Sequence, residues 1–113
     1  DGVSLFDRML KDRDPALIRY ELDLFWAIKA GEDPKALIKR LAGTIFAYHV
    51  KDMKADGSMT SVGAGTIDFA DIFTLNNVAG VQHFYVENDL SPPPYIPDIT
   101  ASFAATSKLL SKA

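Results

Sequence analysis

The spacing of apolar residues along this chain switches repeatedly between a strand-like and a helix-like period. Positions 19–25 alternate between apolar and mostly charged side chains, which places Glu21 and Asp23 on one face of a predicted strand. Residues 45–50 and 81–87 are two further runs of strand composition. By the same alternation, the second strand should present Ile45, Ala47, His49 and Lys51 together, and the third should present Val81, His83, Tyr85 and Glu87.

Helix-like periods lie between and around these strands. Asp33 is a suitable N-cap, and Pro34 suits the first position of the helix that follows it. Asp68 is placed to cap a later helix. The four predicted helices cover residues 4–10, 34–42, 68–78 and 99–110. Between them, the polar segment 54–65 and the proline-rich segment 90–98 predict loops, because proline fixes φ and removes a backbone donor.

The alternation of strands and helices predicts an α/β fold whose parallel strands are joined by right-handed crossovers. A complete (β/α)8 TIM barrel needs eight strands and about 250 residues. With three strands, residues 1–113 therefore predict a single partial domain, equivalent to the C-terminal three-eighths of a TIM barrel. Such a piece has two open sheet edges and one uncovered sheet face.

Composition narrows the classes of function that this fold could serve. The chain is 48% hydrophobic and 24% charged, as in a soluble globular domain, and its net charge of -3 argues against nucleic acid as a partner. It contains no cysteine, so a metal site must use histidine and carboxylates. No apolar run approaches the roughly 20 residues of a membrane span. The cytoplasm and the periplasm both remain open, because lack of cysteine suits either redox environment.

Three metal-ligand side chains stand near the C-terminal ends of the three predicted strands. They are Asp23, His49 and Glu87, separated by 26 and 38 residues. Alone, each has an ordinary explanation: strand-end carboxylates are often caps, and a strand histidine is often a hydrogen-bonded core residue. Parallel α/β proteins place their chemistry at this end of the sheet. Together the three residues therefore favour one divalent metal, of the Mn, Mg, Co or Zn type.

The sequence around these residues resembles a known family. The segments ELDLFWAIKAG, YHVKDM, VGAGTIDFADI and GVQHFYVEND resemble the xylose-isomerase-like TIM-barrel superfamily, in particular bacterial sugar phosphate isomerases/epimerases. The resemblance runs from about Val3 to the C-terminus. It implies two glutamates, one aspartate and one histidine around a divalent metal, of which Asp23, His49 and Glu87 match three. The fourth ligand, a glutamate, is expected on a strand shortly before Asp1.

The resemblance also implies a reaction. In sugar epimerases of this superfamily the two glutamates exchange a proton next to a carbonyl, while the metal polarises the sugar oxygens. Glu87 is the member of that pair found here, so it is the predicted catalytic residue. The chain is then expected to be part of a metal-dependent isomerase, epimerase or dehydratase acting on a small sugar or sugar phosphate.

Three residues are candidate substrate contacts. Lys51 follows His49 on the same face and could bind a hydroxyl, carboxylate or phosphate, although a solvated rim lysine is an equal alternative. Trp26 stands where ketose epimerases and dehydratases of the superfamily often carry a substrate-contacting histidine, and it could instead pack under a loop. Tyr95 could reach the pocket from the proline-rich loop.

Nearby residues are expected to have structural roles. Asp52 should point away from the site and brace the following loop, and Gly63 and Gly65 should shape that loop rather than bind phosphate. His83 lies about a layer deeper than the strand ends and should face the core.

Two other readings of the chain stay open. It could be a non-catalytic or proteolytic piece that binds the N-terminal remainder of the barrel or forms a homo-oligomer; by itself it is expected to be inactive. It could also derive from a metal-dependent phosphodiesterase of the apurinic endonuclease branch. That chemistry needs a histidine-rich zinc cluster, and the chain has two histidines.

Overall fold

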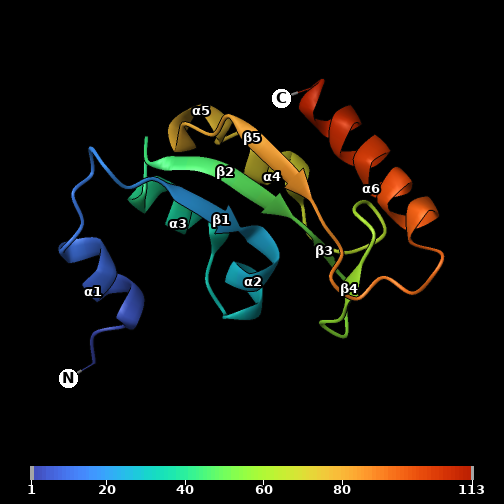
Figure 1. Ribbon diagram of the computed structural model, residues 1–113, viewed down its shortest axis with the longest axis horizontal. Helices are drawn as coiled ribbons and strands as arrows, with labels where there is room; N and C mark the ends of the chain where they lie inside the picture. Colours follow the sequence, from blue (N-terminus) through green and yellow to red (C-terminus); the bar gives the residue numbers. More distant parts are fainter. Residues whose placement is uncertain (1, 113) are drawn as a thin grey trace.

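A computed structural model, which describes residues 2–112, contains a parallel three-stranded sheet. Its strands are β1 (Tyr20–Asp23), β2 (Ile45–Val50) and β5 (His83–Val86), with β2 in the middle and parallel to both neighbours (Figure 1). Helical segments follow the strands along the chain, as in βα units. The predicted α/β class with parallel strands is therefore confirmed.

The remaining elements surround this sheet, and α3 and α4 lie behind it in Figure 1. The helices are α1 (Leu5–Lys11), α2 (Leu24–Lys29), α3 (Pro34–Arg40), α4 (Phe69–Phe73), α5 (Asn76–Ala79) and α6 (Tyr95–Leu110). A two-stranded antiparallel ribbon, β3 (Asp52–Met53) and β4 (Met59–Thr60), follows β2.

The hydrophobic core lies on the helix-facing side of the sheet. Tyr48 and Val50 of β2 are fully buried there, and Tyr48 stacks on Phe73 of α4 with their ring planes 7° apart. Leu24 of α2 and Ile38 of α3 complete the contacts and are also fully buried. Burial of apolar surface on one side of a small sheet is what holds these short helices in place.

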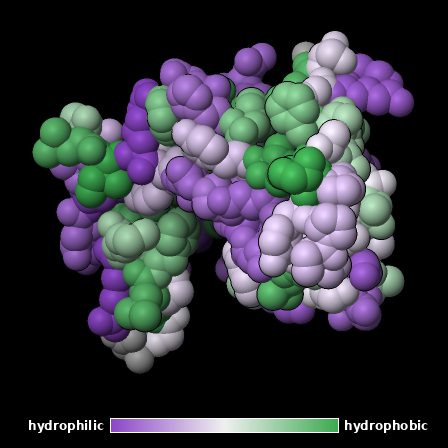
Figure 2. Space-filling model, turned by 45° about the vertical axis from the view of Figure 1, so that its right-hand side comes forward, coloured by the Kyte–Doolittle hydropathy of each residue, from purple (hydrophilic) through white to green (hydrophobic). Residues whose placement is uncertain are grey.

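The other side of the sheet carries the polar residues of the strands. Glu21, His83 and Tyr85 are exposed there. The prediction that His83 faces the core is therefore wrong for this chain: its ring lies 4.7 Å from Phe46 and is stacked with Tyr85. In Figure 2 the hydrophobic groups on the visible surface form separate patches with hydrophilic residues between them.

A register shift in the sheet changes one predicted face. Tyr20 pairs with Ile45, but Glu21 pairs with Ala47, so β2 contains one residue more than β1 at this point. Ile45 consequently packs in the helix-side core with Tyr48, and not on the His49 face as the simple alternation predicted. A β-bulge of this kind leaves no signature in a period-2 pattern.

Several element boundaries also differ from the predicted ones. The first strand ends at Asp23 and not at residue 25, because Asp23 caps α2 through its side chain. The single helix predicted over 68–78 is two short helices, α4 and α5. Helix α6 begins at Tyr95, inside the predicted loop, since proline is tolerated in a first helical turn. The loop predicted over 54–65 includes β4.

Candidate functional site

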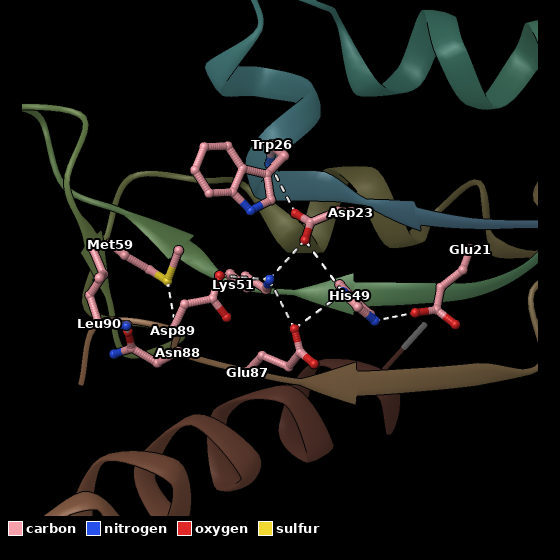
Figure 3. Close-up of polar contacts among 10 residues, drawn as sticks. All are labelled: Glu21, Asp23, Trp26, His49, Lys51, Met59, Glu87, Asn88, Asp89 and Leu90. Carbon is pink, nitrogen blue, oxygen red and sulfur yellow. Dashed lines mark hydrogen bonds and ion pairs between the residues drawn. The ribbon is translucent and has the colours of Figure 1, made fainter. Parts of the chain in front are cut away.

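The three predicted metal ligands converge at the C-terminal end of the sheet. Asp23 ends β1 and pairs in register with His49 of β2, and Glu87 follows β5, where its backbone N–H donates to the Val50 carbonyl at 3.2 Å. Each offers one ligand atom, and these atoms lie within 4.8 Å of one another. Figure 3 shows the side chains pointing toward one another from three different elements. The parallel register alone is enough to bring them together.

His49 is held at both of its ring nitrogens. Its Nδ1 lies 3.4 Å from Asp23 Oδ2 and 3.1 Å from Glu87 Oε2. Its Nε2, on the other side of the ring, contacts Glu21 Oε1 (Figure 3). Glu21 is a site residue that the sequence reasoning did not assign, although its position two residues before Asp23 placed it on the same face.

Lys51 is the most deeply buried charged group of the site. Only 4% of its surface is exposed, so the alternative of a solvated rim lysine is wrong. Its Nζ lies 2.9 Å from Asp23 Oδ2, 2.9 Å from Glu87 Oε2 and 3.0 Å from Asp89 Oδ2. Burial by itself lowers the pKa of Lys51, but hydrogen bonds to Glu87, Asp23 and Asp89 outweigh burial and raise that pKa above its usual value. The ammonium therefore stays charged at neutral pH.

The donor set fits a divalent cation. Two carboxylate oxygens and one imidazole nitrogen are ligands that Mn, Mg, Co and Zn accept. Lys51 contacts the same two oxygens, but a carboxylate oxygen has more than one acceptor position. The cluster contains four carboxylates, Glu21, Asp23, Glu87 and Asp89, but a single ammonium, that of Lys51, which contacts the last three of them. The cluster thus has a formal excess of negative charge that attracts a cation.

Within residues 2–112, only one of the two aromatic candidates is linked to the cluster. The backbone N–H of Trp26 donates to Asp23 Oδ1 at 2.9 Å, while its indole is half exposed and packs edge-on against Phe25. Tyr95 begins α6 and is 61% exposed. Among residues 2–112, no hydrogen bond or ion pair links Tyr95 with the cluster. Trp26 is thus tied to the cluster through its backbone alone.

Asp52 has the bracing role that the sequence suggested. It is 1% exposed, and its carboxylate accepts four backbone N–H bonds: from Met53 at 2.8 Å, Gly63 at 2.9 Å, Gly65 at 3.0 Å and Ile67 at 3.2 Å. A Cβ on Gly65 would lie 2.2 Å from Asp52 Oδ1, so this glycine is needed for close approach. These bonds fix the loop after β4 next to the site.

A cavity of about 410 Å³ lies between this loop and the proline-rich segment. Asn88, Ser61 and Asp98 line it, together with Pro92 and Pro93. Hydrogen bonds from Ser61, Ser91 and Asn88 lower the pKa of Asp98, although burial opposes them. The volume is within the range of small-molecule sites, and Asn88 immediately follows Glu87 in the chain.

Comparisons with known proteins give a consistent picture. No family model matches the chain. An inosose dehydratase from Clostridium beijerinckii is 30% identical over 95 residues, covering 66% of this chain and 32% of that protein. None of the helices within residues 2–112 is long and apolar enough to cross a bilayer.

Two crystal structures of sugar phosphate isomerases/epimerases from Parabacteroides distasonis are similar over nearly the whole chain. One has a TM-score of 0.73 at 26% identity, and the match covers 99% of this chain and 37% of the other protein's chain. The other has a TM-score of 0.77 at 25% identity, and the match covers 92% of this chain and 35% of the other protein's chain. The chain spans about a third of the length of these relatives. The family resemblance inferred from the motifs is confirmed by these matches.

Proposed function

Because this chain resembles the sugar phosphate isomerases/epimerases of the xylose-isomerase-like TIM-barrel superfamily in sequence and fold, we propose that it supplies part of the active site of such an enzyme. The proposed reaction is metal-dependent proton transfer next to the carbonyl of a small sugar or sugar phosphate. The observation that carries the proposal is the convergence of Asp23, His49 and Glu87 at the C-terminal end of a parallel sheet.

Asp23, His49 and Glu87 are the proposed metal ligands, through Oδ2, Nδ1 and Oε2. A bound Mn, Mg, Co or Zn ion would act as a Lewis acid that polarises the carbonyl and hydroxyl oxygens of the sugar. The chain's part is to hold these ligand atoms in place before the substrate arrives. The parallel register of β1 and β2, together with the buried ammonium of Lys51, serves that purpose.

Glu87 is the proposed catalytic residue. Its side chain is 37% exposed, more than those of Asp23 and His49, so it is the proposed metal ligand most open to a substrate. A carboxylate in that position can accept a proton from the carbon next to the carbonyl and return it. Returning the proton to the opposite face of the carbon would require a second acid/base group. Glu87 is the one acid/base group proposed in this chain, so the second would come from another part of the enzyme.

Lys51, which contacts two of the proposed metal ligands, is proposed to bind the substrate beside them. Its ammonium is positively charged, and its three carboxylate partners hold it at one position. A charge fixed in this way can stabilise a negative oxygen that develops during proton abstraction. Trp26 and Tyr95 remain proposed substrate contacts, because both side chains are exposed.

Dehydration is the second candidate reaction. The relative named inosose dehydratase favours it. Trp26 does not distinguish the two reactions, because ketose epimerases and dehydratases of the superfamily both often carry a histidine at that position. Removal of a proton next to a carbonyl is the first step in both cases; loss of hydroxide from the neighbouring carbon as water then distinguishes dehydration. The phosphodiesterase reading has little support, since one histidine lies in the cluster and the other, His83, is exposed on the sheet.

We further propose that the uncovered sheet face is covered in the working enzyme, by the N-terminal remainder of a barrel or by another copy of the chain. Exposed Tyr85 and the partly exposed side chains of His49 and Glu87 lie on that face. The 113-residue chain by itself is expected to be inactive. Size-exclusion chromatography with light scattering on the protein isolated from cells tests this proposal. An isolated monomer of 12.4 kDa would contradict it.

Deuterium exchange tests the proposed reaction. The full-length protein, loaded with Mn²⁺ and incubated in D₂O with a panel of ketoses, inososes and sugar phosphates, should incorporate deuterium next to the carbonyl of at least one of them. Glu87→Gln should lose this exchange by at least about 1,000-fold, because a carboxamide cannot accept the proton. The matched control is Glu32→Gln, at an exposed glutamate after α2. Exchange in Glu87→Gln at the level of the control would refute the catalytic role of Glu87.

A further inference from the structure

Glu21 contacts the cluster at a point separate from the proposed metal ligands. The alternation of β1 places it on the same face as Asp23, and its Cα pairs with that of Ala47, two residues before His49. Its Oε1 contacts His49 Nε2, while His49 Nδ1 faces Asp23 and Glu87 (Figure 3). The imidazole is therefore held on one side by a carboxylate and directed on the other toward the ligand atoms.

This geometry separates Glu21 from the ligand set. The two nitrogens of an imidazole point to opposite sides of the ring, so an ion bound at Nδ1 lies on the far side from a group that contacts Nε2. Glu21 therefore cannot bind the same ion as His49 Nδ1 in the observed conformation. It cannot replace the glutamate ligand expected from another strand.

The chemistry of neutral histidine gives this contact a specific consequence. One ring nitrogen carries a hydrogen and the other a lone pair, and a hydrogen-bond acceptor at one nitrogen fixes which is which. The carboxylate of Glu21 favours the hydrogen at Nε2, whereas Asp23 and Glu87 favour it at Nδ1. A cation bound to Asp23 and Glu87 removes that competition, so Glu21 then holds the hydrogen on Nε2 and leaves the lone pair on Nδ1. It also stops the ring from turning about its Cβ–Cγ bond.

We propose that Glu21 is a positioning residue, which holds His49 in the Nε2–H tautomer and orients Nδ1 to bind the divalent cation. The inference rests on the proposed metal site, but it concerns a residue that touches neither metal nor substrate. In metalloproteins, loss of such an outer partner weakens metal affinity by about 10–100-fold. The same loss is expected for Glu21→Ala.

Calorimetric titration of the metal-free, full-length protein with Mn²⁺ tests the proposal. Glu21→Ala should raise the dissociation constant about 10–100-fold, whereas Glu32→Ala, at an exposed glutamate outside the cluster, should leave it within twofold of wild type. Glu21→Gln keeps an acceptor oxygen of the same reach, so it should recover most of the lost affinity. Wild-type affinity in Glu21→Ala would overturn the proposal. Equal weakness of the folded Gln and Ala variants would also overturn it, because charge would then matter and the acceptor would not.

Nitrogen-15 NMR of the imidazole provides a readout that a merely structural role would not change. In wild type, added Zn²⁺ should shift the Nδ1 resonance and leave the hydrogen of His49 on Nε2. In Glu21→Ala the acceptors that remain are Asp23 and Glu87 at Nδ1, so the metal-free spectrum should show a larger share of hydrogen on Nδ1 than in wild type. An unchanged tautomer in that variant contradicts the inference. Failure of wild type to bind any divalent ion would instead contradict the proposed function, so the two failures are distinguishable.

Discussion

At the scale of single residues, the sequence was most informative where a side chain's position in a strand decides its surroundings. Asp23, His49 and Glu87 could be placed together because parallel strands in register bring equivalent positions to one edge. The same reasoning could not reveal that Lys51 is buried among three carboxylates, since burial depends on loops packed over the strand end. It also missed the contact between Glu21 and His49, because that contact depends on a rotamer.

Asp52 gives a prediction at this scale. Its buried carboxylate accepts four backbone N–H bonds, and Asp52→Asn would turn an N–H₂ group toward at least one of these donors. Leaving buried donors unpaired costs about 1–3 kcal/mol each, so the free energy of unfolding should fall by about 2–4 kcal/mol in urea denaturation. Asp56→Asn, in the exposed turn of the β3–β4 ribbon, serves as the control. A loss for Asp52→Asn no larger than that of the control would contradict the assigned role.

At the scale of elements, local sequence signals identified the helices and strands but not the points where one replaces another. Asp23 both ends β1 and caps α2 by accepting from the Trp26 N–H, so one residue closes a strand and contributes to the site. The split between α4 and α5 and the bulge in β2 depend on tertiary packing around Phe73 and Ile45. The spacing of apolar residues predicts a whole helix or strand, and it does not show a break or a bulge at a single residue.

Asp98 connects three separate segments and gives a pH-dependent prediction. Its Oδ1 accepts from Ser61 Oγ after β4, and its Oδ2 accepts from Asn88 Nδ2 after β5 at 2.8 Å, while Asp98 itself belongs to α6. Because these bonds lower the pKa of Asp98 below its usual value near 3.8, they stabilise the folded state above that pH. The stabilisation disappears as the pH falls through the lowered pKa.

Asp98→Asn should therefore be less stable than wild type at pH 6–7, and the difference should shrink below about pH 4. Urea denaturation at a series of pH values measures this difference. Ser61→Ala removes one partner of the same carboxylate, so combining both substitutions should cost less than the sum of the two single effects. A difference between Asp98→Asn and wild type that stays constant from pH 7 to pH 3 would contradict the assignment.

At the scale of the whole molecule, the features of the chain are those of a segment of a TIM barrel. Three parallel strands carry helices on one side and the candidate metal cluster at their C-terminal ends, and the chain spans about a third of the similar isomerase/epimerase structures. The fold class could be predicted from sequence because strand and helix periods alternate regularly. What covers the open sheet face could not be predicted, since the period of a strand shows which residues share a face but not what packs against that face.

Asp23, His49 and Glu87 are proposed to hold one divalent cation, and anomalous diffraction from crystals of the full-length protein grown with Mn²⁺ would locate that ion. A single strong anomalous peak is expected about 2.0–2.3 Å from Asp23 Oδ2, His49 Nδ1 and Glu87 Oε2, with Glu21 still on His49 Nε2. A fully occupied Mn²⁺ site elsewhere, with these three side chains free of metal, would contradict it.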